Sequence, residues 1–294
     1  MRISVDHLTE YHYDERVSFG EHSLFLRPRE SQTVHVERFE LESTPMGKLR
    51  WVRDCFNNVV AVMHFGLMES ETLSFQCRMA FEVAEENPFD FILEPRATNF
   101  PFAYDRREQG GLAPYLGADE SDGPSLDPWV SRELGTVTQG AQTLHLLTQL
   151  NSAIHDRIAY ERRDEEGVQS PEETLSRACG SCRDMAQLFV AASRHLGLAS
   201  RFVSGYLYEP PSLGPGGQAN RAAGSMHAWA EVYLPGAGWR GFDPTNGILT
   251  DHHFITAAVA NRPQWVNPIQ GEYFHAARVP SQMRVTLAIG EDAR

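Results

Sequence analysis

The sequence has few cysteines, no long apolar segment and no apolar leader, and each absence argues against a class of protein. Only four cysteines occur in 294 residues, at irregular spacing, so a disulfide framework is not expected and a reducing compartment fits best. No stretch of about 18 apolar residues is present that could cross a membrane. The first residues carry charges where a signal peptide needs an apolar run. We therefore predict a cytoplasmic protein.

Basic residues are also scarce relative to acidic ones. The chain has 26 Lys and Arg against 39 Asp and Glu, for a formal net charge of −13. No cluster of basic residues is available to neutralise phosphate groups. We predict that neither nucleic acid nor an anionic membrane surface is a partner.

Hydrophobic residues make up 41% of the sequence, which is enough to form hydrophobic cores. The first third of the sequence also has a β-strand pattern. Apolar and polar residues alternate with a period of two in the segments 33–41, 49–52, 59–65 and 73–83. Turn-forming residues separate these segments, which is typical of an antiparallel sandwich. We predict an N-terminal β-sandwich domain over residues 1–86. Its scattered histidines are expected on strand faces, not as metal ligands.

The regular pattern fades after this domain and returns as helical periodicity. Residues 87–140 are punctuated by proline and glycine but carry too many aromatic residues for a free linker. We predict that 87–140 is a connector that packs on both domains. A helical stripe of leucine and isoleucine runs through residues 141–159, and we place a second domain at 141–294.

A Gly-Ser turn leads directly into Cys182, and an amphipathic helix follows it. Apolar residues recur with helical spacing from Met185 to Leu196, and Gly197 marks the end. The free N–H groups and positive dipole end of a helix start favour a thiolate, and they could also hold an oxyanion. Cys182 is therefore a candidate nucleophile, although position alone is more typical of a core cysteine that caps a buried helix.

Two later segments supply partners for that thiol. Residues 226–234 form one predicted strand, and residues 239–246 form another that closes at Asp243. The turn 235–238 joins them, so His227, at the start of one strand, can lie beside Asp243, at the end of the other. A thiol nucleophile needs a base within hydrogen-bond reach and a third group to orient that base. Cys182, His227 and Asp243 are thus the predicted catalytic residues.

Other residues near these segments have competing interpretations. Trp229 and Trp239 either line a cleft for the acyl donor or pack beneath the sheet. Asp184 is most simply an acid in the first turn of the Cys182 helix, and we keep it as a further candidate for the cleft. The Pro- and Gly-rich loop 210–224 is expected to line part of the pocket.

Metal and redox interpretations are also open. Cys179 and Cys182 form a C-x-x-C pair, but a second pair or a close histidine pair for zinc is missing, as is a βαβ context for redox chemistry. We expect Cys179 to be a buried bystander, with a disulfide that masks Cys182 as a lesser alternative. His252 and His253 could suggest a metal, but no third ligand is evident, so a polar loop is favoured.

Several of these segments resemble the bacterial transglutaminase-like superfamily. Residues 180–184, 226–232 and 238–246 are similar to its catalytic core. Residues 11–13, 24–29 and 54–58 are similar to the β-rich region that precedes this core in many bacterial members. Asn57 stands where that region usually has glycine, and asparagine also tolerates a positive φ.

The resemblance implies an α+β fold in which a papain-like, transglutaminase-like core follows the β-sandwich, with a cysteine-bearing helix packed on an antiparallel sheet. It implies acyl transfer on peptide or protein amides through a thioester at Cys182. His227 would move the proton, and Asp243 would orient the His227 ring. Water as acceptor gives hydrolysis, and an amine gives cross-linking. Many bacterial members are described as candidate cysteine proteases, so hydrolysis is the favoured outcome.

Two alternatives to hydrolysis remain, namely protein-glutamine amine transfer and a non-catalytic binding module that retains the fold. No cofactor is expected. Some animal relatives require calcium, but no D-x-D-x-D-G type loop is present. We therefore predict activity without a metal.

Overall fold

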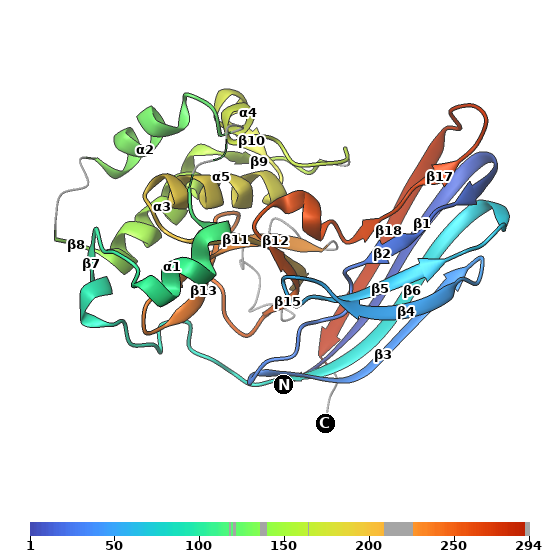
Figure 1. The fold of residues 1–294 in the computed structure, drawn as a ribbon, viewed down its shortest axis with the longest axis horizontal. Coiled ribbons are helices and arrows are strands. Elements are labelled where there is room, and N and C mark those ends of the chain that lie inside the picture. The colour runs from blue at the N-terminus through green and yellow to red at the C-terminus, as the bar shows by residue number, and fades with distance from the viewer. Residues whose placement is uncertain (118, 120–121, 136–139, 164, 209–225, 292–294) are drawn as a thin grey trace, which may run out of the picture.

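The computed structural model of the protein describes residues 1–294 except 118, 120–121, 136–139, 164, 209–225 and 292–294. Figure 1 shows two parts side by side, with long strands forming one part and the helices gathered in the other. The predicted class, an α+β chain with an N-terminal antiparallel β part and a transglutaminase-like core, is confirmed.

The β part consists of two facing antiparallel sheets. The strands of the first sheet are β17 (Tyr273–Phe274), β1 (Arg2–Phe19), β6 (Glu69–Val83) and β3 (Val34–Thr44) in that order, and β18 (Ser281–Glu291) also pairs with β1. The strands of the second sheet are β16 (Ile269–Gln270), β2 (His22–Leu24), β5 (Val59–His64) and β4 (Lys48–Arg53). The period-two pattern of the sequence explains this arrangement, since alternate residues of β1 and β6 are buried between the sheets.

The C-terminal strands belong to this β part and not to the second domain. Strand β18 pairs along β1, with Ile3 opposite Glu291 and Tyr13 opposite Ser281, and in Figure 1 the last strand runs beside the first. The predicted second domain of 141–294 is therefore too long at its C-terminal end. A strand that closes a sheet begun some 270 residues earlier (from about residue 10 to about residue 285) leaves no local sign of its partner in the sequence.

The helical part is built around a five-stranded antiparallel sheet. Its strands are β14 (Ile248–Leu249), β13 (Gly238–Asp243), β12 (His227–Leu234), β11 (Ser200–Leu207) and β15 (Phe254–Ala260) in spatial order. Helix α5 (Cys182–His195) packs on β11 and β12. Helices α2 (Leu126–Leu134), α3 (Thr143–Arg157) and α4 (Pro171–Arg177) pack around α5. Two short ladders complete this part, β7 (Asn99–Phe100) with β8 (Ala141–Gln142) and β9 (Ala159–Tyr160) with β10 (Cys179–Gly180).

The described residues of the segment 87–140 belong to the helical half. It contains α1 (Arg106–Leu112) and α2, together with the short 3₁₀ turns Pro95–Ala97 and Ala113–Tyr115. Tyr104 donates its hydroxyl to the Tyr233 carbonyl at 2.9 Å and accepts the Ala199 N–H at 2.9 Å. Trp129, on α2, lies in the same buried cluster as α5. The high aromatic content of this segment therefore reflects core packing.

The two halves are joined by a polar clamp at the turn after β4. The side chain of Asn58, which is fully buried, donates to the Val259 carbonyl at 2.9 Å and accepts the Val259 N–H at 2.9 Å. Because β15 is an edge strand, this amide satisfies backbone groups that would otherwise be unpaired. Asn57, beside it, has a φ of 64°, the left-handed conformation expected where the related pattern has glycine.

Candidate active site

Cys182 is the first residue of helix α5. Its side chain is 7% exposed, and residues 185, 188, 189 and 192 on the inner face of the helix are fully buried. The apolar stripe of the sequence therefore anchors the helix, as predicted. Strand β10 ends two residues before Cys182 and pairs in parallel with β9, so that Gly180 lies opposite Tyr160. The nucleophile candidate is held between a short ladder and a buried helix.

His227 and Asp243 meet across the hairpin of β12 and β13. Nε2 of His227 lies 3.0 Å from Oδ2 of Asp243, and both side chains are completely shielded from solvent. Asp243 also accepts the Thr245 N–H at 2.9 Å and an amide hydrogen of Asn246 at 2.6 Å. The antiparallel pairing expected from the sequence thus brings these two residues together, and the turn after β13 fixes the carboxylate.

The charges around His227 favour its protonated form. Burial lowers the pKa of this imidazole, but the Asp243 carboxylate and the neighbouring Cys182 side chain outweigh burial and raise it from 6.5 to about 10. The other ring nitrogen, Nδ1, is buried and makes no regular hydrogen bond to any described residue. Since Nε2 faces Asp243, Nδ1 is the nitrogen left for the thiol. The His227 ring thus lies between the Asp243 carboxylate and the Cys182 side chain, and both favour its protonated form.

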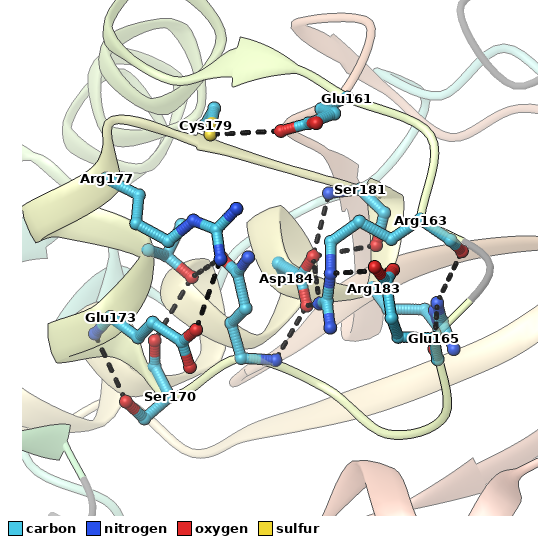
Figure 2. Close-up of polar contacts among 12 residues, drawn as sticks. Glu161, Arg163, Glu165, Ser170, Glu173, Arg177, Cys179, Ser181, Arg183 and Asp184 are labelled. Atoms are coloured by element: carbon cyan, nitrogen blue, oxygen red, sulfur yellow. Dashed lines mark hydrogen bonds and ion pairs between the residues drawn. The ribbon is translucent and has the colours of Figure 1, made fainter.

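Asp184 is a buried anchor for the start of the helix. Figure 2 shows Arg163 and Ser181 converging on its carboxylate. Both carboxylate oxygens accept hydrogen bonds from Nη1 of Arg163 at 2.8 Å. The backbone N–H groups of Gln169 and Ser181 also donate to this carboxylate, at 2.7 and 2.8 Å. Although burial acts in the opposite direction, these bonds hold the pKa of Asp184 below its usual value. With an exposure of 0%, Asp184 cannot line a cleft, so that expectation is corrected.

Gly180 is required by the same anchor. A side chain at this position would place its Cβ 2.8 Å from the Cβ of Asp184, closer than packed carbon atoms approach. The glycine of the Gly-Ser turn therefore allows the chain to pass beside the buried carboxylate. This contact explains in physical terms why the turn before Cys182 carries glycine.

Cys179 differs from the buried bystander that we expected. It is partly exposed, and its thiol donates to Oε2 of Glu161 at 3.2 Å. Arg177 lies on its other side, and the interaction with Cys179 raises the pKa of this guanidinium. Cys179 and Cys182 are both free thiols. The side chain of Cys179 is directed toward a charged surface pair.

The two tryptophans pack and do not lie together beside the site. Trp229 is 1% exposed and stacks on the His227 ring with centroids 6.2 Å apart, so it restrains the imidazole by packing. Trp239 lies near the opposite end of the hairpin, where it pairs with Tyr233 and carries the Arg201 guanidinium 4.1 Å above its ring. Neither residue supports the predicted cleft lining. The loop 210–224 falls outside the described residues.

Tyr160 is a neighbour of the nucleophile that the sequence did not single out. It sits on β9 opposite Gly180, and burial together with the charge of Cys182 raises the pKa of its phenol. Only the parallel pairing of β9 with β10 brings it to Cys182, and such a contact has no sequence period to reveal it.

Among the described residues, one group has the residue types and closeness of a metal site, namely Asp251, His252 and His253. It lies on the turn between β14 and β15, apart from Cys182 and Asp243 in the chain. In the described part of the chain, no helix is long and apolar enough to cross a bilayer.

Comparisons with known proteins agree with this architecture. A family model described as the transglutaminase-like superfamily matches residues 133–244, and one described as the bacterial transglutaminase-like N-terminal region matches residues 3–82. An uncharacterized protein of Mycobacterium tuberculosis is 27% identical over 276 residues, which cover 92% of this chain and 87% of the relative. An uncharacterized protein of Mycobacterium leprae is 31% identical over 101 residues, or 34% of each chain.

A solved structure shares the whole fold. The crystal structure of a protein described as a "putative cysteine protease" from Cytophaga hutchinsonii superposes with a TM-score of 0.73 at 16% identity, covering 100% of this chain and 92% of that chain. At this identity the likeness establishes the fold alone. The two family models match in their expected order and together span more than half of the sequence, so the chain belongs to the bacterial transglutaminase-like superfamily.

Proposed function

We propose that the protein is a cysteine hydrolase that cleaves peptide or protein amides through a thioester on Cys182. The observation that carries this proposal is the fully buried His227, bonded to Asp243 at 3.0 Å by one nitrogen and adjacent to Cys182 with the other left unpaired. An imidazolium held in this way stabilises a thiolate and can then deliver its proton. The fold supports thiol-dependent acyl transfer more broadly, and hydrolysis is the outcome that we favour.

In the first half of the reaction, the Cys182 thiolate attacks the carbonyl carbon of the amide. A sulfur–carbon bond forms, and the carbonyl oxygen takes the negative charge of a tetrahedral intermediate. His227 then gives its proton to the amide nitrogen, the carbon–nitrogen bond breaks, and the amine leaves. Asp243 keeps the ring oriented and stabilises its positive charge.

In the second half, water attacks the thioester. His227, now neutral, removes a proton from the water as the new carbon–oxygen bond forms. The carbon–sulfur bond breaks, which releases the acid and restores the thiolate next to an imidazolium. The backbone N–H of Cys182, at the start of α5, is the donor available for the oxyanion in both halves.

Amine transfer is the second candidate. The same thioester would form, and a primary amine would replace water as the acceptor. The described residues around Cys182 do not favour one acceptor, so the comparison of products decides between them. A binding module that does not catalyse is the third candidate. The hydrogen bond between His227 and Asp243, with Cys182 beside the ring, argues against it.

The proposal is tested by trapping the acyl-enzyme. The purified protein is mixed with an amide peptide library, quenched in acid and digested, and the mass of the peptide that contains Cys182 is measured. We expect an acyl adduct on Cys182 that decays in water to the free acid. Added primary amine that captures the acyl group at a rate above that of water would instead establish amine transfer.

Thiol alkylation provides an independent measurement with a control inside the chain. Cys182 should react faster with iodoacetamide near neutral pH than Cys55, which is an ordinary exposed thiol. Cys179→Ala should retain the acyl adduct, whereas Cys182→Ala should lose it. Equal alkylation of Cys55 and Cys182, with no adduct from any peptide, would sink the enzyme proposal and leave the binding module.

The proposal includes a substrate class and a compartment. The substrates are peptide or protein amides, in line with the description of the Cytophaga hutchinsonii neighbour, and the compartment is the cytoplasm. Fractionation of cells that express the full chain, with the Cys182 adduct as the assay, tests both together. Activity confined to an extracellular fraction would contradict the second.

A further inference from the structure

The turn between β14 and β15 places two imidazoles and a carboxylate together. Asp251, His252 and His253 each offer a ligand atom, and these atoms lie within 4.8 Å of one another. The sequence showed the two histidines but no third ligand at a helical or strand spacing. The tight turn that leads into β15 makes Asp251 the third donor, which an argument from regular spacing cannot detect.

Each ring has one nitrogen placed for an ion. Nδ1 of His253 lies 3.0 Å from both carboxylate oxygens of Asp251, which is close enough for nitrogen and carboxylate to bind one ion at about 2.0–2.2 Å each. The ion would take the place of the hydrogen that this nitrogen otherwise donates to Asp251. Nδ1 of His252 lies 3.4 Å from the carbonyl oxygen and 3.5 Å from the backbone nitrogen of Glu86. Its Nε2 has no hydrogen-bond partner among the described residues and is the nitrogen left for the ion.

His252 is placed in the way that proteins place histidine ligands. A metal-binding histidine commonly gives its second ring N–H to a carboxylate or a backbone carbonyl, which fixes the tautomer and the orientation of the ring, and the Glu86 carbonyl is in that position for His252. The His252 and His253 rings have centroids 4.2 Å apart and an interplanar angle of 34°. Tyr208 also stacks on His253, with centroids 5.9 Å apart, so packing restrains this ring.

The surroundings suit a cation. Asp251 and His253 are partly exposed, with side-chain exposures of 29% and 26%, which leaves room for water or a further ligand on a bound ion. Glu86 and Glu291 lie at the edge of the cluster, beside His252 and Tyr208 respectively. Arg240 pairs with Glu86 at 3.3 Å.

A simpler explanation accounts for only part of the cluster. Asp251 accepts the N–H of His253 at 2.9 Å, which is the bond of an ordinary turn. That bond explains the aspartate but not the contact between the two imidazoles, whose ring centroids lie 4.2 Å apart. A shared metal ion explains the pair, because imidazole nitrogens and a carboxylate oxygen are ligands that a divalent transition metal binds.

We propose that Asp251, His252 and His253 bind a divalent transition-metal ion with a nitrogen and oxygen donor set, of which Zn²⁺ is the physiological representative. The site is separate from the triad and takes no part in the proposed acyl transfer. It is nevertheless close to it, because Phe254, the next residue, packs against the His227 ring at 6.0 Å. A bound ion would fix the start of β15 behind the imidazole.

The test is a titration of the full chain, stripped of metal with EDTA, with Co²⁺. We expect one Co²⁺ per chain, visible absorption bands of nitrogen and oxygen coordination, and no sulfur-to-metal charge-transfer band in the near ultraviolet. Zn²⁺ should displace the bands. His252→Ala and His253→Ala should each weaken binding by roughly tenfold or more, as expected for loss of a ligand or its support.

Two matched variants separate this site from other metal-binding groups. His64→Ala removes an exposed histidine that pairs with Glu21 at 3.2 Å, and it should leave Co²⁺ binding unchanged. Cys182→Ala removes the thiol of the proposed active site, and it should also leave binding unchanged. The variants His252→Ala and His253→Ala keep the backbone bond from the N–H of residue 253 to Asp251. They therefore test the site even if a change of Asp251 itself, such as Asp251→Asn, prevents folding.

Three results would overturn the proposal. The first is a titration without saturable binding. The second is binding that survives both histidine variants. The third is a charge-transfer band that disappears with Cys182→Ala, which would assign the metal to the thiol. None of these outcomes bears on acyl transfer, which the Cys182 adduct reports by itself.

Discussion

Two buried histidines, one in each half of the molecule, have pKa values shifted in opposite directions. His7, on β1 of the sandwich, is 2% exposed, and His227, on β12 of the five-stranded sheet, is 1% exposed. Burial lowers the pKa of His7 from 6.5 to about 4, and the opposing effect of Asp6 is smaller. The pKa of His227 instead rises to about 10. Equal burial therefore favours the neutral ring in one half and the protonated ring in the other.

The difference lies in the partners of the two rings. His7 contacts two neutral hydroxyl groups, those of Tyr206 and Thr9, each at 3.2 Å. His227 contacts a buried carboxylate at 3.0 Å and a cysteine. Desolvation penalises charge at both positions, and only a buried opposite charge reverses that penalty. A buried histidine therefore indicates chemistry only together with its partner.

The largest effect is expected from removal of the charged ring. His227→Gln should lower kcat for amide hydrolysis by about 10⁴-fold or more, as for other members of nucleophilic triads. The matched variant, His7→Gln, removes an equally buried ring from the sandwich and should leave kcat per folded molecule unchanged. Steady-state kinetics with the peptide identified by acyl trapping measures both, and an equal loss in both variants would contradict the distinction.

The next effect tests whether Asp243 alone makes the two histidines differ. In Asp243→Asn the ring loses its buried counter-charge, so the pKa of His227 should fall below 6.5, toward that of His7. The rate should fall by about 10³- to 10⁴-fold, because the imidazolium is no longer stabilised. An NMR titration of the His227 ring checks the pKa. If it stays above 6.5, Asp243 is not the dominant charge.

A smaller effect is expected from the anchor below Cys182. Asp184→Asn removes the charge that pairs with Arg163 at 2.8 Å in a fully buried position, so the unfolding free energy should fall by about 3–5 kcal/mol. In the folded fraction kcat should fall by up to about 10²-fold with little change in KM, because the thiol is misplaced.

The control for the anchor is an ion pair at the surface. Glu173→Gln breaks the exposed pair with Arg177 and should change neither the rate nor the stability measurably. The alkylation rate of Cys182 in Asp184→Asn provides the second reading. A normal alkylation rate and normal kcat in a destabilised variant would make Asp184 purely structural.

The smallest effect is the dependence of stability on pH. The folded-state pKa of His7 is lowered, so the unfolded chain binds the proton first, and stability is lost as the pH falls from 6.5 toward 4, by up to roughly 3 kcal/mol. The folded-state pKa of His227 is raised, so its contribution is present below pH 6.5 and is lost as the pH rises toward 10.

Urea unfolding across this pH range measures both slopes. His7→Gln should flatten the acid side alone, and Asp243→Asn should flatten the alkaline side alone. If both variants changed the slope of stability against pH on the same side of the range, acid or alkaline, the two histidines would not have opposite effects on the pH dependence of stability.

Local patterns were sufficient for most of the candidate site. Cys182 at a helix start and His227 at a strand start follow from hydrophobic periodicity, and a short turn between two strands is enough to bring Asp243 to His227. These inferences need only neighbours in the sequence. The assignments that failed needed distant partners, such as the C-terminal strand that pairs with β1 or the exposure of Cys179 beside Glu161.

The sequence by itself determined the β-rich character of the first 86 residues, the helix that starts at Cys182 and the three residues of the proposed triad, because each depends on short-range periodicity and turn chemistry. Tertiary structure alone decided the rest. It joined the C-terminal strand β18 to β1 and buried Asp184 against Arg163. It also brought Tyr160 to Cys182 and shifted the pKa values of two equally buried histidines in opposite directions. These outcomes depend on which charges and side chains surround a group in space, and no local pattern specifies them.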